Sequence, residues 1–499
     1  MTATVETFVV PDNVQQFVKC SEKSILIHGK REESSSGQFI DNYDPGTGQV
    51  IGRLARGNLE DIDRAVGSAR RAFDAGWRDL KSGARARCLL TLADLIDENV
   101  EELATLETLD NGKPIAESMY IDLAMTAEVF RYYGGWTTKF AGSVLPVSPT
   151  VGSAFAYTRQ EPLGVVGAIV PWNFPALLLS WKLGPALAAG NTVVVKPSEL
   201  TSLSTIRLAG LALEAGIPPG VLNVVTGLGG EAGQALAEHG GVAKVTFTGS
   251  TATGRKILAA SVGNLKQVTL ELGGKSPNIV FADADLDSAV QGAFLGIFMN
   301  QGQVCCAGSR AFVEASIYDD FLDRLSSAAS RINLGHGLAE GSDMGPLVSA
   351  SQRQRVLDFI ESGTAEGATV VCGGGAPLGN GYFVSPTIFT DVEDKMAIAQ
   401  EEIFGPVLSV LPFTSEAEVI TRANASRYGL AAGVWTQNLR RAHGVAAALE
   451  AGTVWINSYN MIDPSMPFGG YKESGFGRDL GADAMRSYTQ TKSVWVGLD

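Results

Sequence analysis

Two adjacent cysteines, Cys305 and Cys306, lie in a polar stretch bracketed by glycines, NQGQVCCAGSR at residues 300–310. A cysteine attacks carbon electrophiles as its thiolate, and main-chain N–H groups in a tight turn stabilise that anion. The setting therefore predicts a nucleophilic cysteine with a stabilised thiolate. A buried, unreactive cysteine is the alternative, because none of the four histidines stands in a Cys–His signature of the protease type.

Two glutamates and one asparagine could complete this chemistry. Glu271 ends an apolar run in VTLELGGK, where burial would raise the pKa of its carboxyl group towards that of a general base. Asn173 lies between two prolines in PWNFP, and this rigid loop could aim its amide at an oxyanion or use it as a helix cap. Glu402, in QEEIFGP, is either a functional carboxylate or part of a solvated acidic turn.

Two glycine-rich turns could bind the phosphates of a nucleotide. Residues 226–232, TGLGGEA, match the G-x-G-x-x-A fingerprint, but the next strand ends without an acidic residue for the ribose, so an ordinary glycine turn explains them nearly as well. In FTGSTATG, Gly249 permits close approach of a ligand, and Ser250 or Thr251 can cap a helix whose first N–H groups form an anion site. An N-capped helix without a ligand is the alternative for this second turn.

A lysine and a glutamate follow another strand, in VVVKPSE. Ligands of open parallel sheets gather where the strands end, so Lys196 and Glu199 could hold ribose hydroxyls from both sides. A surface lysine and a glutamate favoured by the helix dipole are the alternative.

Short β-branched runs alternate with helical stretches and must position these residues, which predicts an α/β fold with a parallel sheet. Residues 57–140 are expected to be largely helical, and a second region rich in β–α units is expected from about 275 to 460. The stretch around 193–247 predicts consecutive β–α–β crossovers. The expected strands are Val165–Val170, Thr192–Val195, Leu222–Val225, Lys244–Thr248, Val268–Leu272 and Asn278–Phe281, with helices at Leu203–Ala215 and Glu231–His239.

Composition limits the possible partners. The chain has 499 residues and a formal net charge of −14, and it lacks a basic stripe, which argues against nucleic acid. No segment offers the ~20 apolar residues of a membrane span. The five cysteines form no C-x-x-C pair, so neither a zinc site nor a disulfide framework is expected, and a cytoplasmic location fits best.

Two segments fit the α/β pattern poorly. Residues 143–161, SVLPVSPTVGSAFAYTRQE, and the tail 493–496, SVWV, are β-prone and carry no helix. Exposed strands of this kind invite pairing with another chain. A decorated loop and a frayed terminus are the alternative.

Taken in order, the motifs resemble those of the NAD(P)-dependent aldehyde dehydrogenase superfamily over nearly the whole chain, from about Asn42 to Val494. They are PWNFP, KPSE, FTGSTATG, ELGGK, NQGQVCCAGSR, EEIFGP and PFGGYKESGFGRDLG. The resemblance implies a Rossmann-like dinucleotide-binding domain of residues 1–142 and 162–272 and an α/β catalytic domain of residues 273–475. It also implies small β oligomerisation elements at 143–161 and 476–499, and a homo-oligomer, with a tetramer favoured over a dimer.

The resemblance also gives each candidate residue a role. Cys305 takes the position of the nucleophile, Glu271 that of the general base and Asn173 that of the oxyanion amide. The cofactor contacts it implies are the adenosine ribose for Lys196 and Glu199, the pyrophosphate for Gly249 and Ser250, the adenosine side for Trp172, and the nicotinamide ribose and ring for Glu402 and Phe404.

The activity that the resemblance implies is oxidation of an aldehyde through a thiohemiacetal and a thioester on Cys305. Glu271 favours hydrolysis to the free acid, because relatives that acylate coenzyme A typically lack this glutamate. NAD is expected over NADP, which stays possible, since Glu199 would repel a 2′-phosphate.

The family's substrate tunnel maps onto apolar positions, Phe174, Leu178, Trp181, Met299, Val304, Ile462 and Phe468. An apolar, aromatic aldehyde is therefore expected, and IDPSMPF at 462–468 looks similar to phenylacetaldehyde-type members. A betaine or amino aldehyde, favoured by Asp463 near the tunnel mouth, or an aliphatic aldehyde is the alternative. Two other classes stay open, a catalytically silent structural protein on this fold and a thiol esterase without a nicotinamide cofactor.

Overall fold

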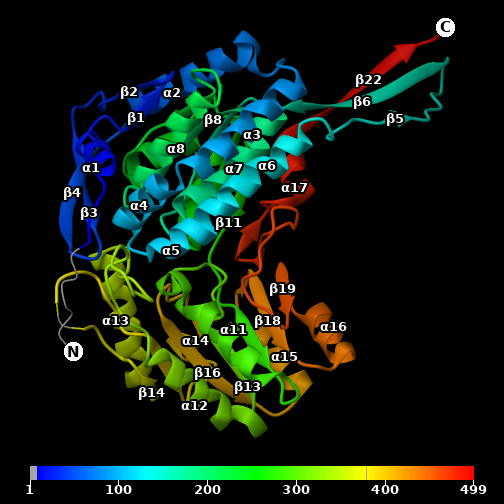
Figure 1. The fold of residues 1–499 in the computed structure, drawn as a ribbon. Helices are drawn as coiled ribbons and strands as arrows, with labels where there is room; N and C mark the ends of the chain where they lie inside the picture. The colour runs from blue at the N-terminus through cyan, green and yellow to red at the C-terminus, as the bar shows by residue number, and fades with distance from the viewer. Residues whose placement is uncertain (1–7, 378) are drawn as a thin grey trace.

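The computed structural model describes residues 8–377 and 379–499. Two α/β lobes, each built on its own sheet, lie one above the other in Figure 1, and a ribbon of strands projects from the upper lobe. The C-terminus lies at the tip of this ribbon. Within the described residues, no helix is long and apolar enough to cross a membrane, and no group of three potential metal ligands occurs.

An eight-stranded sheet forms the centre of the first lobe, in the order β2-β1-β9-β8-β7-β10-β11-β21. Its strands from β9 to β11 are parallel, and the pairs at both edges are antiparallel. The bounds are β1 Ile25–Ile27, β2 Lys30–Glu32, β7 Val165–Ile169, β8 Thr192–Lys196, β9 Leu222–Val224, β10 Lys244–Thr248, β11 Gln267–Glu271 and β21 Gly475–Phe476.

The order of this sheet reverses at β7. From β7 the chain adds β8 and β9 on one side, and it then crosses back to add β10 and β11 on the other. The expectation of consecutive crossovers in a parallel sheet is confirmed, and β9 and β10 belong to the same sheet without being neighbours in it. Ligands of open α/β sheets bind where the order reverses, at the carboxyl ends of the strands, and here these ends lead into Asn173 and Ser250.

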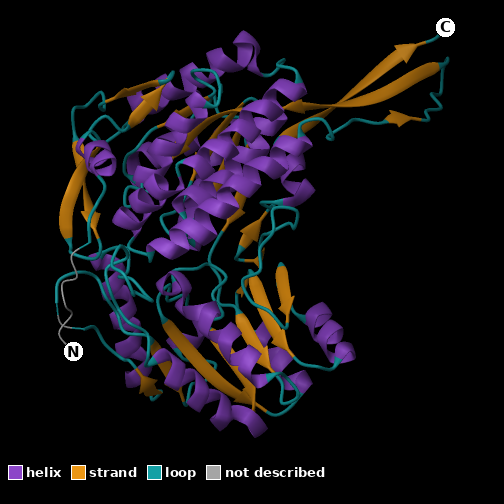
Figure 2. Ribbon diagram, viewed as in Figure 1, coloured by secondary structure: helices purple, strands orange, loops and turns teal. Residues whose placement is uncertain are grey.

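Helices cover both faces of the first sheet (Figure 2). Helix α7, Pro175–Ala189, is apolar around almost its whole circumference and nearly completely buried, because it lies between the sheet and α3 and α6. Bounds of the other helices in this lobe are α1 Asp12–Lys19, α2 Leu59–Ala72, α3 Ser82–Glu98, α4 Val100–Asn111, α5 Ile115–Glu117, α6 Ala124–Trp136, α8 Leu203–Glu214, α9 Gln234–Glu238 and α10 Thr251–Ala260. The predicted helical region 57–140 is confirmed.

The second lobe has a seven-stranded sheet, ordered β14-β15-β16-β13-β12-β18-β19, parallel except at β14. Its strands are β12 Pro277–Val280, β13 Arg310–Glu314, β14 Thr369–Cys372, β15 Thr387–Thr390, β16 Val407–Phe413, β18 Ala431–Trp435 and β19 Thr453–Ile456. The helices are α11 Leu286–Phe298, α12 Tyr318–Ala329, α13 Ala350–Ala365, α14 Ala397–Gln400, α15 Glu416–Asn424 and α16 Leu439–Ala448. The predicted second α/β region is confirmed.

Smaller pairings complete the chain. Strands β3 Phe39–Asp44 and β4 Gln49–Ala55 form a hairpin, and β17 Tyr428–Gly429 pairs with β20 Tyr471–Lys472. The projecting ribbon, here called the flap, consists of β5 Val144–Leu145, β6 Ala154–Pro162 and β22 Thr489–Gly497. Strand β22 pairs with β6 antiparallel along its whole length.

The C-terminal segment 476–499, expected as one oligomerisation element, divides into two parts in the structure. Helix α17, Gly481–Ser487, packs against α7, and Met485 and Tyr488 are buried in the first lobe. The apolar side chains of α17 complete the core of the first lobe beside α7. Within this segment, only β22 therefore belongs to the flap.

Candidate active site

The loop that carries Cys305 follows α11 and has an unusual backbone. Asn300, Gln301 and Gly302 all have positive φ angles, of 47°, 55° and 71°. At Gly302 a Cβ atom would lie 2.1 Å from the carbonyl oxygen of Gly405, so only glycine fits. Three successive left-handed residues turn the chain sharply, and such strain persists only where the surroundings fix it.

Asn173 joins this loop to the first lobe. Its side chain is buried, and Nδ2 donates a hydrogen bond to the carbonyl oxygen of Gln303 at 2.9 Å. A second hydrogen bond runs in the opposite direction, from Nδ2 of Asn300 to the carbonyl oxygen of Asn173 at 2.8 Å. The two predicted residues Asn173 and Cys305, 132 positions apart in sequence, therefore lie on loops that contact each other.

This junction leaves two N–H groups for a negatively charged oxygen. The Asn173 amide nitrogen carries two hydrogens, and Gln303 accepts one of them. In the part of the chain that the structure describes, the main-chain N–H of Cys305 has no acceptor. An oxyanion formed beside the Cys305 sulfur would have both groups as potential donors.

Glu271 ends β11 inside the first lobe, as predicted. Its side chain is 4% exposed, and neither carboxylate oxygen has a partner among the described residues. Burial raises the pKa of Glu271 well above its ordinary value, and the charge of Asp479 adds to the rise. A carboxylate with two free oxygens and a raised pKa has the properties of a general base.

Cys305 is half-buried, and its surroundings oppose ionisation. A hydrogen bond with Cys306 and burial raise the pKa of the Cys305 thiol well above its usual range, and the charges of Glu402 and Glu271 raise it further. The expectation of a stabilised thiolate is therefore wrong for this state of the protein. The hydrogen bond with Cys306 and burial outweigh whatever the turn contributes, and the carboxylates add to the rise because a second negative charge in a buried site is costly.

Glu402 lies across the ELGGK turn from the thiol. Its Oε1 accepts a hydrogen bond from the main-chain N–H of Gly274 at 3.0 Å, and burial raises the pKa of Glu402 to about 7. A Cβ at Gly273 would lie 2.1 Å from Glu402 Oε2 and displace this carboxylate, and a Cβ at Gly274 would lie 2.5 Å from the main-chain oxygen of Cys305. The solvated acidic turn considered from sequence is thus excluded, and the glycines of ELGGK have a steric reason.

Trp172 and Phe404 contact each other. Their ring centroids are 5.1 Å apart and the planes are nearly perpendicular. The resemblance placed Trp172 on the adenosine side of the cofactor and Phe404 on the nicotinamide side. Phe404 follows the Glu402 turn, and the cofactor contacts expected of both rings stay predictions.

The predicted ribose and phosphate residues gather at the carboxyl edge of the first sheet. Lys196 ends β8, is nearly fully buried, and its Nζ lies 2.8 Å from Glu199 Oε2. Ser250 caps α10 by accepting a hydrogen bond from Thr253, which confirms the predicted cap. Gly249 follows β10 directly, and its N–H donates to the carbonyl oxygen of Glu271. Paired Lys and Glu head groups beside a free helix N-terminus suit a ribose and a phosphate.

The predicted tunnel residues belong to one apolar cluster that also contacts Cys305. Trp181 and Phe468 pack edge to face at 5.2 Å between centroids. Phe174 and Leu178 lie at the start of α7, and Val304 precedes the thiol. Met299 and Ile462 are half-buried at the edge of the cluster. Asp463 is exposed, and its carboxylate accepts hydrogen bonds from Ser465.

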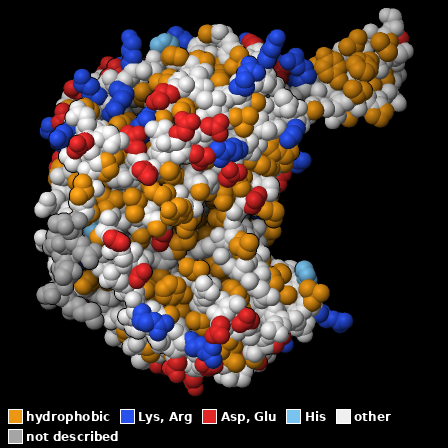
Figure 3. All heavy atoms as spheres, in the orientation of Figure 1, with side chains coloured by type: hydrophobic (Ala, Val, Ile, Leu, Met, Phe, Trp, Pro, Cys, Tyr) orange, Lys and Arg blue, Asp and Glu red, His pale blue; other side chains and the backbone are white. Residues whose placement is uncertain are grey.

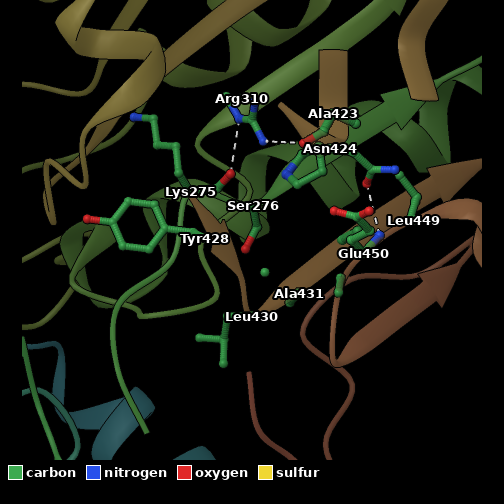
Figure 4. A pocket seen from close by; sticks show the side chains of 14 residues that line it. Lys275, Ser276, Arg310, Ala423, Asn424, Tyr428, Leu430, Ala431, Leu449 and Glu450 are labelled. Atoms are coloured by element: carbon green, nitrogen blue, oxygen red, sulfur yellow. Dashed lines mark hydrogen bonds between the residues drawn. The ribbon is translucent and has the colours of Figure 1, made fainter. Parts of the chain in front are cut away.

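A pocket near ELGGK is separate from the thiol (Figure 4). Arg310 crosses it and donates to the carbonyl oxygens of Lys275 and Ala423, both at 3.0 Å. Burial lowers the pKa of Lys275 to about 7. These contacts hold the turn after Glu271 against the second lobe.

Sequence reasoning missed several charged residues beside the candidate site. Lys182 of α7 is buried and its Nζ lies 2.8 Å from Asp479 Oδ2, and both charges act on Glu271. Lys113 is also buried and donates to the carbonyl oxygen of Asn173 at 2.8 Å. A signal existed for Lys182, because a single lysine in the apolar run LLLSWKLGPAL must find a buried partner.

Comparison with known proteins adds independent evidence. The sequence profile described as the aldehyde dehydrogenase family matches residues 31–494. A mitochondrial aldehyde dehydrogenase of Rattus norvegicus is 48% identical, with 99% of this chain and 95% of that protein covered.

Solved structures agree. An NAD⁺ complex of an aldehyde dehydrogenase from Bacillus cereus is 51% identical, with 99% of this chain and 100% of that chain covered and a TM-score of 0.96. An indole-3-acetaldehyde dehydrogenase of P. syringae, in complex with NAD⁺ and IAA, is 46% identical, with 98% and 99% covered and a TM-score of 0.94. Matches over nearly the whole chain, together with the junction of Cys305, Asn173 and Glu271, lead to one conclusion: this chain belongs to the aldehyde dehydrogenase family and is an enzyme of that class.

Proposed function

We propose that this enzyme oxidises an apolar aromatic aldehyde, of the arylacetaldehyde type, to the carboxylic acid with NAD as the hydride acceptor. The observation that carries the proposal is the hydrogen bond from Asn173 to the Cys305 loop, which brings a thiol and two free N–H groups together beside a buried carboxylate. This combination serves attack on a carbonyl carbon, stabilisation of the resulting oxyanion and later hydrolysis.

In the first half of the proposed reaction, the Cys305 sulfur attacks the aldehyde carbon. The Cys305 proton passes to solvent water as the S–C bond forms, because the surroundings keep the free thiol neutral. The Asn173 amide and the Cys305 N–H hold the oxygen of the tetrahedral adduct. The chemistry that bound NAD supplies is hydride acceptance, which leaves a thioester on Cys305.

In the second half, Glu271 removes a proton from water, and the resulting hydroxide attacks the thioester carbon. The C–S bond breaks, the carboxylic acid leaves, and the proton that Glu271 took from water passes to the departing sulfur, which restores the thiol of Cys305. Burial suits Glu271 to this role, since its raised pKa makes it a stronger base than an exposed carboxylate. A hydrolytic outcome fits the presence of Glu271.

The residues at the carboxyl edge of the first sheet fit NAD. Lys196 and Glu199 would hold the adenosine ribose, and Gly249 with the N-terminus of α10 would face the pyrophosphate. Glu402 and Phe404 would enclose the nicotinamide end, and the Trp172 ring, expected on the adenosine side, packs against Phe404. Glu199 would repel a 2′-phosphate, which favours NAD over NADP. Solved relatives in complex with NAD⁺ support this choice.

The apolar cluster beside Cys305 supports the proposed substrate class. Its walls carry the aromatic side chains of Phe174, Trp181 and Phe468, which offer an aryl group edge-to-face packing. The relative from P. syringae is named for an indole-substituted acetaldehyde, which is also aromatic. Asp463 is the one observation for a cationic aldehyde, but its carboxylate already holds the Ser465 turn.

The flap supports assembly into a homo-oligomer, and we favour a tetramer. The ribbon consists mainly of two strands, since β5 has only two residues, and an isolated two-stranded ribbon is marginally stable. Figure 3 shows apolar side chains over much of its surface. Val144, Phe155, Trp495 and Leu498 are exposed there. A second copy of this chain is the proposed occupant of that surface. A cytoplasmic location stays a prediction.

Alkylation by iodoacetamide tests the electrostatics of the thiol. In the free enzyme we expect the rate at Cys305 to keep rising above about pH 9, because its raised pKa keeps the thiol protonated at neutral pH. Cys306→Ala removes the largest cause of the raised Cys305 pKa and should shift the pH dependence of the alkylation rate to lower pH. Peptide mass spectrometry assigns the modified cysteine, and a profile that levels off below pH 7 would contradict the analysis.

A panel of phenylacetaldehyde, a straight-chain aldehyde and betaine aldehyde, each followed by NADH absorbance, tests the proposed function. We expect the highest kcat/KM with phenylacetaldehyde, no turnover in Cys305→Ala, and turnover in the matched variant Cys306→Ala. Ester cleavage without any reduction of NAD would favour a thiol esterase. A betaine aldehyde rate above the aromatic one would overturn the substrate class.

Sedimentation equilibrium tests the role of the flap. We expect the full chain to be a tetramer, and Trp495→Asp to shift it to smaller species because the substitution places a charge in the proposed contact. Leu439→Asp, at an exposed apolar residue of the second lobe, is the control that should leave the mass unchanged. A monomeric full chain would refute the assignment.

A further inference from the structure

A cluster of buried charges lies directly behind Asn173, at the corner between α4 and the turn of π-helix Ser118–Leu123. Lys113 is fully buried there and forms ion pairs with Asp122 and, at 3.7 Å, with Glu107. None of these residues belongs to the site that sequence reasoning assembled. Buried charges of this kind call for an explanation, because well-packed apolar residues of similar volume often give equal stability.

Lys113 contacts the candidate site through the main chain of Asn173. Its Nζ donates to the Asn173 carbonyl oxygen at 2.8 Å, and Nδ2 of Asn300 donates to the same oxygen at 2.8 Å. Asn111 adds a longer hydrogen bond, of 3.4 Å, to this oxygen and a 2.8 Å bond to the carbonyl of Trp172. One carbonyl group thus receives three donors, and the only charged one comes from Lys113.

The same ammonium group contacts the substrate side. Lys113 Nζ lies 4.3 Å from the centroid of the Phe174 ring, within the range of a cation–π contact. The PWNFP loop has no regular structure between the end of β7 at Ile169 and the start of α7 at Pro175. Lys113 therefore fixes the loop on both sides of the Asn173 side chain, at the carbonyl oxygen of this residue and at the ring of the next.

We propose that Lys113 is a positioning residue for the oxyanion site, which holds the Asn173 amide in line with the Cys305 N–H. A charge-assisted hydrogen bond is stronger and more directional than a neutral one, and Asp122 keeps the lysine in place. A small displacement of a transition-state donor costs far more in rate than in stability. The inference rests on the oxyanion role proposed above for Asn173.

A purely structural role for Lys113 predicts a different pattern. Loss of the lysine would then weaken the fold. It would slow the reaction by the same factor with asparagine at residue 173 as with alanine there. A positioning role requires instead that the effect on rate disappear when there is no amide to position. A double-mutant cycle between Lys113 and Asn173 separates the two.

The experiment measures the first-turnover rate of NADH formation by stopped flow, with saturating NAD and the best aldehyde of the panel. Lys113→Met should lower this rate by about tenfold or more in the native background and by less than about twofold in Asn173→Ala. The KM for NAD should stay unchanged, since Lys196 and Glu199 lie on other elements. Equal fold-losses in the two backgrounds would overturn the proposal.

Lys266→Met is the matched control. This lysine is also buried, and its Nζ donates to two main-chain carbonyl oxygens, of Ala237 and His239, before β11 begins. Lys266→Met should lower the thermal midpoint, as Lys113→Met does. Its fold-effect on the first-turnover rate should be the same in the native background as in Asn173→Ala. A coupling with Asn173 as large as that of Lys113 would contradict the inference.

Lys113→Met leaves the carboxylate of Asp122 unpaired and risks a loss of folding. The variant Lys113→Met/Asp122→Asn removes both charges and serves if the single variant is insoluble. The same coupling is expected from it, and a native first-turnover rate would overturn the proposal. If Asn173→Ala alone leaves the rate unchanged, the oxyanion role itself fails, so the two failures are distinguishable.

Discussion

The hydrogen bond between the Asn173 amide and the carbonyl of Gln303 constrains the whole molecule, because it joins two independently built sheets at the point where the thiol lies. Asn173 lies on the loop that follows the carboxyl end of β7, where the order of the first sheet reverses, and Gln303 lies on a loop of the second lobe. Several neighbouring contacts hold the two loops of this hydrogen bond in position. Arg310 braces the turn after Glu271, and the left-handed residues before Cys305 fold its loop back on itself.

The electrostatics of the site explain why the junction is so closely packed. Cys305, Glu271 and Glu402 each have a raised pKa, and burial contributes to every one of these shifts. A carboxyl group whose pKa is higher in the folded chain than in the unfolded chain lowers the free energy of unfolding as the pH rises from the unfolded pKa to the folded pKa. The reason is that the unfolded chain releases the proton at the lower pH. The protein therefore carries a cost in stability to keep a base and a neutral thiol together away from water. The charge of Asp479 adds to the cost at Glu271, and the charges of Lys182 and Arg478 limit it because they lower the pKa of this carboxyl group.

Local sequence patterns were enough for the strands, for the helix cap at Ser250 and for the burial of Glu271. Each depends on a few neighbouring residues, and the structure reproduces the central strands to within a residue or two. The contacts among Cys305, Asn173 and Glu402 could be expected only through the resemblance, since they join positions far apart in the chain. Roles of these residues stay predictions.

Other features depend on distances that sequence patterns do not contain. The return of the chain from β9 to β10 across β7 is a property of the assembled sheet. The contact between Trp172 and Phe404 spans more than two hundred residues and leaves no local sign in the sequence. The thiolate expectation considered only the main chain of the turn around Cys305 and omitted the hydrogen bond with Cys306, the burial of the thiol and the carboxylates that folding brings to it. Lys113 gave no local sign of its contact with Asn173.

Trapping the covalent intermediate tests the central claim most directly. Glu271→Gln removes the proposed base for water while leaving the thiol and the oxyanion donors in place. Mixed with NAD and phenylacetaldehyde, this variant should form NADH once per site and then gain the mass of a phenylacetyl group, located by peptide mass spectrometry on Cys305. Sustained turnover at the native rate with no acyl group on Cys305 would contradict the account.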